Sequence, residues 1–190
     1  MKKFHKSSDV AKNAVVGSGT SIWNEAQIRE NVVVGKNCII SKGVYIDSGC
    51  IVGNNVKIQN YASLYKQTIV EDEVFIGPYV CFSNDKHPRA TTIDGKLKSE
   101  KDWESGITIV RRGASIGAGA ILLPSVTISE YAMIGAGSVV TKNVDAHTLV
   151  MGNPAVIKGY VCICGDIISK GVIKPKILLC KKCQKLKKLK

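Results

Sequence analysis

The chain has 190 residues, 45% hydrophobic and only 6% aromatic, so its core must be built mainly from small and branched aliphatic side chains. It has no apolar run of 18 residues, which excludes a membrane-spanning helix, and its first residues, MKKFHKSSDV, lack the apolar segment of a secretory signal. Seven cysteines in such a chain favour the reducing cytoplasm, where thiols pack or bind metal. The net charge of +12 predicts an anionic partner such as a nucleic acid, an acidic lipid or a phosphorylated small molecule.

The first part of the chain is an internal repeat with a period of six. Large apolar residues recur at Val10, Val16, Ile22, Ile28, Val34, Ile40, Ile46, Val52, Ile58, Leu64, Val70, Ile76 and Phe82. The residue two before each, from Ala14 to Val80, is small or β-branched, and the residue after is often glycine, as at Gly17, Gly35, Gly53 and Gly77. This period fits neither a helix nor an alternating strand. It predicts stacked coils with flat parallel strands and tight corners, in which glycine permits the corner backbone.

The repeat stops after Phe82 and resumes at Val110, from where it runs to Val140. The gap of 28 residues is not a multiple of six, so we expect an insertion of about 22 residues, placed at 83–104. Its polar stretch VCFSNDKHPRATTIDG indicates a functional loop.

Residues 10 to about 160 resemble the hexapeptide-repeat acyltransferases. The resemblance implies an all-β fold, a left-handed parallel β-helix of six to seven coils, as a domain of residues 1–159. It also implies a homotrimer with active sites between neighbouring subunits. A purely structural β-helix is the alternative, but it needs no polar insertion.

Shorter motifs narrow the resemblance to acetyl-CoA-dependent N-acetyltransferases of the 3-amino group of nucleotide-linked sugars, such as the enzyme acting on UDP-2-acetamido-3-amino-2,3-dideoxyglucuronate. They are Ser21-Ile22-Trp23, Val56-Lys57-Ile58-Gln59-Asn60, Leu64-Tyr65-Lys66, Val70-Glu71-Asp72, Phe75-Ile76-Gly77-Pro78, Phe82-Ser83-Asn84-Asp85, Pro88-Arg89-Ala90, Gly113-Ala114-Ser115-Ile116-Gly117 and Gly152-Asn153-Pro154-Ala155. The chain departs from these relatives at Trp23-Asn24-Glu25, where they often have Trp-His-Phe. The expected setting is cytoplasmic synthesis of a surface polysaccharide, and the alternative substrate is a dTDP-3-amino-3,6-dideoxyhexose.

The resemblance gives Asn84 the role of orienting the attacking amine. A simple turn at Asn84-Asp85 is the alternative to this role. His87 is the candidate base, although the proline that follows holds it in an extended conformation. Residues 18 apart should stack, which places Lys66 one coil below Asn84, followed by Ser48 and Glu30. A lysine there suits an acidic sugar or a phosphate. Asp85, Arg89 and, by the motif that contains it, Gln59 complete the predicted substrate site.

Coenzyme A is expected on the coils after the insertion. Ala118 and Ala136 are small and 18 residues apart, so a pantetheine arm can approach the backbone there. Lys142 and Lys158 are the candidates for its phosphates.

The appendage at residues 160–190 contains Cys162-Ile163-Cys164 and Cys180-Lys181-Lys182-Cys183, a pattern that predicts a four-thiolate zinc site with a small strand pair formed by the Ile-Leu-Leu before Cys180. Four unliganded thiols are the alternative. Residues 170–190 hold nine lysines and no acidic residue, and the terminal LKKLK is typical of a solvated, disordered tail. A nucleic-acid-binding zinc ribbon is the rival function, but it leaves the coils and the loop motif unexplained, so we expect no specific nucleic-acid partner and no membrane span. The carbonic-anhydrase branch of the fold is rejected, because His5, His87 and His147 are far apart in the sequence.

Overall fold

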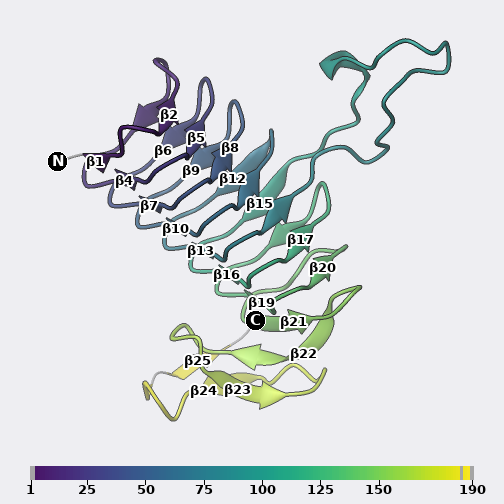
Figure 1. Ribbon diagram of the computed structural model, residues 1–190. Helices are drawn as coiled ribbons and strands as arrows, with labels where there is room; N and C mark the ends of the chain where they lie inside the picture. The colour runs from purple at the N-terminus through teal and green to yellow at the C-terminus, as the bar shows by residue number, and fades with distance from the viewer. Residues whose placement is uncertain (1–2, 185, 189–190) are drawn as a thin grey trace.

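The computed structural model describes residues 3–184 and 186–188 and is a parallel β-helix of short strands with a projecting loop and a small cap at its C-terminal end (Figure 1). Three sheets form the sides of the coil, here named A, B and C. Sheet A contains β1 (Lys3–Phe4), β4 (Ser21–Ile22), β7 (Ile39–Ile40), β10 (Lys57–Ile58), β13 (Phe75–Ile76), β16 (Ser115–Ile116), β19 (Met133–Ile134), β21 (Thr148–Met151), β22 (Val156–Val161) and β23 (Ile167–Lys170). Sheet B contains β2 (Asp9–Val10), β5 (Gln27–Ile28), β8 (Tyr45–Ile46), β11 (Ser63–Leu64), β14 (Cys81–Phe82), β17 (Ile121–Leu122) and β20 (Val139–Val140). Sheet C contains β3 (Val15–Val16), β6 (Val33–Val34), β9 (Ile51–Val52), β12 (Thr68–Val70), β15 (Thr108–Val110) and β18 (Thr127–Ile128).

The core is the column of aliphatic side chains that the period of six predicts. The second residue of nearly every two-residue strand points inward, and the aliphatic positions from Val16 to Val140 are at most 5% exposed. The small positions two residues earlier, such as Ala26, Cys38 and Ala62, are fully buried as well. Because each coil covers the apolar side chains of its neighbours, the repeat is stable only as a stack. The predicted all-β parallel β-helix is confirmed, but the eight parallel strands of sheet A, from β1 to β21, make about eight turns, more than the expected six to seven coils.

The expected role of the glycines is wrong. Gly17, Gly35, Gly53 and Gly77 are absent from the positions with positive φ, which lie two residues further on, for example at Asn37 and Asn55. The glycines are required by close approach: a Cβ on Gly35 would lie 2.5 Å from the carbonyl oxygen of Gly53 in the next coil. The left-handed corner position two residues further on is taken by other glycines, such as Gly19, Gly43 and Gly49, and in more coils by residues with a side chain, among them Asn31, Asn37 and Asn55.

The insertion leaves the stacking register intact. Val52 pairs with Val70 at a separation of 18 residues, whereas Val70 pairs with Val110 at a separation of 40. The difference of 22 residues is the predicted length of the insertion, and the period of 18 returns between Val110 and Ile128. The inserted segment projects away from the prism, which is the three-sided stack formed by sheets A, B and C (Figure 1). It contains a short 3-10 helix, η1 (Glu100–Asp102).

The cap continues sheet A in an antiparallel sense. Strand β22 pairs with β21 and β23, so this strand runs across the boundary predicted at residue 159. A second hairpin joins β24 (Ile177–Leu179) to β25 (Leu186–Lys188), which confirms the strand pair expected before Cys180. The prediction of a disordered LKKLK segment is wrong for residues 186–188, because they pair with β24, and its last two residues lie outside the described part of the chain.

Candidate active site

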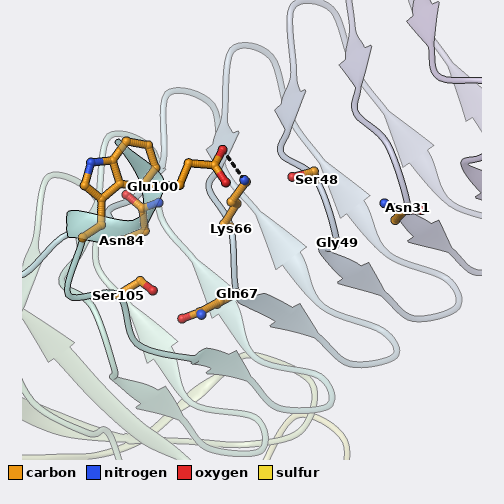
Figure 2. Close-up of a pocket in the computed structure, with 9 residues that line it drawn as sticks. Asn31, Ser48, Gly49, Lys66, Gln67, Asn84, Glu100 and Ser105 are labelled. Atoms are coloured by element: carbon orange, nitrogen blue, oxygen red, sulfur yellow. Dashed lines mark hydrogen bonds and ion pairs between the residues drawn. The ribbon is translucent and has the colours of Figure 1, made fainter. Parts of the chain in front are cut away.

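A pocket of about 410 Å³ lies at the corner that follows sheet B, beneath the base of the inserted loop (Figure 2). It is lined by Asn31, Ser48, Gly49, Lys66, Gln67, Asn84, Glu100, Trp103 and Ser105. Leu64 pairs with Ile46 and with Phe82, so Ser48, Lys66 and Asn84 occupy equivalent places in three successive coils. The predicted column is confirmed for all four residues, because Ile28 pairs with Ile46 and so places Glu30 beside Ser48, although Asn31 and not Glu30 lines the pocket.

Lys66 is paired with the loop. Its Nζ lies 2.6 Å from Oε1 of Glu100, and the ammonium points toward this carboxylate in Figure 2. The hydrogen bond to Glu100 raises the pKa of Lys66 and outweighs the opposing effect of desolvation. The lysine therefore presents a fixed positive charge, and its side chain is 27% exposed against 68% for that of Glu100.

Asn84 is held by the regular coil. It follows Phe82, which is fully buried, and Ser83, whose hydroxyl donates a hydrogen bond of 2.9 Å to the carbonyl oxygen of Leu122. The Asn84 side chain is half-buried, lines the pocket and has no hydrogen-bond partner among the described residues. Its amide is therefore both positioned and available to a ligand.

The other loop candidates lie outside the pocket lining. Asp85 accepts a hydrogen bond of 2.9 Å from the backbone amide of His87, as in a turn. His87 is 75% exposed at its side chain, and its Nδ1 lies 2.9 Å from Oε2 of Glu104. Arg89 is exposed and donates to the carbonyl oxygen of Pro88. The structure thus brings His87 to a carboxylate partner, but it does not bring His87, Asp85 or Arg89 into the pocket of Asn84.

The remaining candidates are distributed over several corners. Gln59 is half-buried at the corner after sheet A and does not line the pocket. Ala118 and Ala136 stack as expected, because the amide of Gly137 donates to the carbonyl oxygen of Ala118 at 2.8 Å, and both alanines are exposed.

The two lysines predicted to bind coenzyme A are also separated. Lys142 is exposed and follows β20 at the same corner as Asn84, two coils further along, since Phe82 pairs with Leu122 and Leu122 with Val140. Lys158 is exposed on β22 in the cap. Within one chain these residues do not form a single surface with Ala118 and Ala136.

Sequence reasoning missed three lining residues of the loop: Glu100, Trp103 and Ser105. The loop has no repeat to place them. A signal was nevertheless present at Ser99, whose backbone amide and hydroxyl both bond Asp102 to form a capping box that starts η1. This turn presents Glu100 toward Lys66.

The four cysteines of the appendage form a cluster in the cap. Their sulfur atoms lie within 4.8 Å of one another. Cys162 is buried and burial raises the pKa of its thiol, whereas the backbone amides of Cys183 and Lys182 lower the pKa of Cys180 to about 7. Cys38 and Cys50 are buried in the β-helix core as expected, and Cys81 is half-buried outside the cluster.

Two family models match the chain. Residues 13–48 match the bacterial transferase hexapeptide (six repeats), and residues 107–142 match the hexapeptide repeat of succinyl-transferase. Both matched stretches consist of hexapeptide repeats, in agreement with the period of six. No helix in the described part of this hexapeptide-repeat protein is long and apolar enough to cross a membrane.

Individual relatives of this hexapeptide-repeat protein are named acetyltransferases. It is 58% identical over 59 residues to the dTDP-3-amino-3,6-dideoxy-alpha-D-galactopyranose 3-N-acetyltransferase of Aneurinibacillus thermoaerophilus, covering 31% of each chain. It is 30% identical over 97 residues to the galactoside O-acetyltransferase of Lactococcus lactis subsp. lactis (strain IL1403), covering 50% of this chain and 47% of the relative. It therefore spans about a third to a half of the length of these curated relatives.

A solved structure shares the fold. A point mutant of the GDP-perosamine N-acetyltransferase from Caulobacter crescentus, in complex with CoA and GDP-perosamine, aligns with a TM-score of 0.52. It is 20% identical, and the match covers 83% of this chain and 56% of that one. At this identity the likeness establishes the β-helix and nothing finer.

Proposed function

We propose that this hexapeptide-repeat protein is an acetyl-CoA-dependent N-acetyltransferase that acts on the 3-amino group of a nucleotide-activated amino sugar. The observation that carries the proposal is the pocket in which Asn84 and Lys66 stack beneath the inserted loop. The name of the Aneurinibacillus relative, a 3-N-acetyltransferase of a dTDP-linked amino sugar, supports the same reaction class. Cytoplasmic synthesis of a surface polysaccharide remains the expected setting.

The reaction forms an amide from a thioester. The amine nitrogen attacks the acetyl carbonyl carbon, the carbonyl oxygen becomes an oxyanion, and the carbon–sulfur bond then breaks to release coenzyme A as its thiolate. Asn84 accepts a hydrogen bond from the amine N–H through its side-chain oxygen and so directs the nitrogen lone pair at the carbonyl. An amide side chain is not a base at neutral pH, so the proton of the amine must go elsewhere.

His87 is the best candidate for the proton acceptor. Its Nδ1 is held by Glu104 at 2.9 Å, which leaves Nε2 as the nitrogen able to take a proton. The loop that carries this pair projects away from its own prism (Figure 1), so a neighbouring subunit would have to bring the acetyl group and the amine to it. Asp85 would hold the turn that precedes the histidine, and Arg89 would meet an anionic part of the substrate.

A homotrimer is therefore part of the proposal. The outward-facing residues of sheet C form an apolar ladder of Val15, Val33, Ile51, Ile69 and Ile109. Val15, Val33 and Ile51 are 60%, 42% and 46% exposed, which is a large apolar surface for consecutive coils of one face. Packing this ladder against a second and a third copy would bury it and place each loop over a neighbour. The predicted coenzyme A residues, Ala118, Ala136, Lys142 and Lys158, would then contact the cofactor from more than one corner.

For the sugar, a uronate linked to UDP is the preferred substrate. Lys66 lies one coil below Asn84, where a carboxylate or a phosphate next to the reacting amine would replace Glu100 as its partner. The neutral 3-amino-3,6-dideoxyhexose of a dTDP-sugar is the second candidate, favoured by the name of the Aneurinibacillus relative. Gln59 belongs to the proposed substrate contacts only in the assembled trimer.

The test is a thiol-release assay with acetyl-CoA and a panel of acceptors: UDP- and dTDP-linked 3-amino sugars, with and without a carboxylate. We expect free thiol only with a 3-amino sugar nucleotide and the fastest release with the uronate. Faster turnover of the neutral dTDP-sugar would assign the second candidate. Binding of DNA or RNA with a steep salt dependence, without any thiol release, would overturn the enzyme and favour the rival nucleic-acid function.

A further inference from the structure

The C-terminal cap contains a second site, independent of the proposed enzymatic activity. We propose that it binds one tetrahedral zinc ion through the thiolates of Cys162, Cys164, Cys180 and Cys183. All four sulfur atoms lie within 4.8 Å of one another, with 3.4 Å between Cys162 and Cys183 and 3.6 Å between Cys164 and Cys180. Four sulfurs at about 2.3 Å from a central zinc ion are separated by roughly 3.8 Å, which this cluster approaches without rearrangement.

Two similar turns present the thiols. After Cys164, the amide of Gly165 donates to the carbonyl oxygen of Cys162 at 2.9 Å, and Gly165 has a φ of 85°. After Cys183, the amide of Gln184 donates to the carbonyl oxygen of Cys180 at 2.8 Å, and Gln184 has a φ of 53°. In both turns the left-handed residue reverses the chain directly after the second cysteine, so that both thiols of each pair face the same point.

Beyond Val161, the buried residues among the described side chains of the cap are cysteines and not aliphatic residues. The large apolar residues there are mostly exposed: Ile163 38%, Ile167 47%, Val172 69%, Ile173 86% and Leu179 55%. Cys162 and Cys180, in contrast, are only 6% and 1% exposed. A segment this small that buries thiols gains its stability from a bound metal or a cross-link.

The local charge also suits a metal–thiolate centre. Four thiolates around a divalent ion carry a net charge of about −2. Lys181 and Lys182 lie inside the second turn, between two of the cysteines, and residues 170–190 hold nine lysines and no acidic side chain. Asp166 is a carboxylate near the cluster, and its Oδ2 accepts a hydrogen bond of 4.0 Å from the Cys180 thiol, but it is not one of the four residues whose ligand atoms all lie within 4.8 Å of one another.

The metal would join the two hairpins of the cap to the end of the β-helix. Cys162 directly follows Val161, whose amide donates to the carbonyl oxygen of His147 in the last coil at 2.8 Å. Cys180 directly follows β24, which otherwise pairs only with β25 among the described strands. Coordination by both pairs therefore fixes the outer hairpin on the inner one.

The experiment measures metal in the full chain, purified without an affinity tag and under reducing conditions. We expect about one zinc per chain by elemental analysis, and cobalt exchanged into the site should give the intense sulfur-to-metal absorption of tetrahedral cobalt thiolate. The double variant Cys180→Ser with Cys183→Ser should lose both signals. Cys81→Ser is the matched control, because Cys81 lies outside the cluster, and it should retain them.

A second readout does not depend on the variants folding. Removing the metal with a chelator should accelerate tryptic cleavage in residues 170–182 at least about tenfold, because the metal-free segment opens more often, while the β-helix signal in circular dichroism stays unchanged. Intact mass showing two disulfides, one equivalent of iron in place of zinc, or metal-free protein whose four cap thiols react freely would each overturn the assignment.

Discussion

The ammonium of Lys66 lies 2.6 Å from the carboxylate of Glu100, although 34 residues separate them in the chain. One belongs to the rigid coil and the other to the inserted loop, so the pair links the loop to the coil at the pocket of Asn84. In this pair Glu100 neutralises the positive charge of Lys66, which is the charge that we propose binds an acidic substrate. Glu100 would then compete with the substrate for Lys66.

This competition predicts the effect of removing the loop carboxylate. The Glu100→Gln variant lacks the carboxylate that forms an ion pair with Lys66 among the described residues, so the KM for an acidic sugar nucleotide should fall severalfold. Asp94→Asn removes the same charge from an exposed part of the same loop and should leave KM unchanged. Steady-state kinetics of thiol release measures both. An unchanged KM in Glu100→Gln, or an equal fall in Asp94→Asn, would contradict competition at Lys66.

Reversing the charge of the lysine should change the choice of substrate. Lys66→Glu places an anion one coil below Asn84, where it repels a uronate or a phosphate. We expect kcat/KM to fall at least about tenfold more for an acidic acceptor than for a neutral one, about 1.4 kcal/mol of discrimination. The ratio of the two values is the measurement. Equal losses for both acceptors would exclude a contact of Lys66 with the sugar carboxylate.

Asn84 should contribute more to turnover than His87. Asn84→Ala removes the group that orients the amine, and we expect kcat to fall at least about tenfold, about 1.4 kcal/mol of transition-state stabilisation, with the oligomer intact. His87→Ala leaves the exposed imidazole position to water and should cost less. An inactive His87→Ala variant beside a nearly normal Asn84→Ala variant would assign the catalysis to the loop histidine instead.

Self-association should depend on sheet C. Ile51→Lys places a charge in the apolar ladder, and we expect the proposed trimer to dissociate to monomers in light scattering coupled to size exclusion. Ile121→Lys makes the same change on the outer face of sheet B, where the original side chain is 40% exposed against 46% for Ile51. That control should stay trimeric. Dissociation of Ile121→Lys alone would place the interface on sheet B.

The two kinds of corner glycine should respond differently to substitution. A Cβ at Gly117 would lie 2.5 Å from the backbone nitrogen of Ala136, so Gly117→Ala should destabilise the fold by about 1 to 3 kcal/mol. Gly119 has a φ of 66°, but a Cβ there meets nothing within 4 Å, and Gly119→Asn should cost less than about 1 kcal/mol. Denaturant unfolding measures both. A larger loss in Gly119→Asn would contradict the steric account.

The repeat made most of the fold predictable, because burial at each position follows from its place in a period of six. The stacking of Ser48, Lys66 and Asn84 followed from the same arithmetic. Glu100 and Trp103 could not be found this way, since the insertion has no period and its contacts with the coil, such as the ion pair of Glu100 with Lys66, join residues far apart in the sequence. The role of Gly17, Gly35, Gly53 and Gly77 was predicted wrongly, because a glycine in the sequence does not reveal whether it is needed for a positive φ or for the close approach of the next coil. The coenzyme A residues were chosen by size and charge, and the structure places Ala118 and Ala136 at one corner of the coil, Lys142 at another and Lys158 in the cap.

The insertion leaves the coil at Ser83 and returns to it so that Val110 pairs directly with Val70. A bridge between Asp85 and Ser105 closes its base. The coil strands on either side keep their register, so a change in this segment should alter the stability of the segment and not that of the coils. The loop can therefore change in length or sequence without altering the pairing of the coils, so that Val70 and Val110 would remain neighbours even in a chain that lacked it.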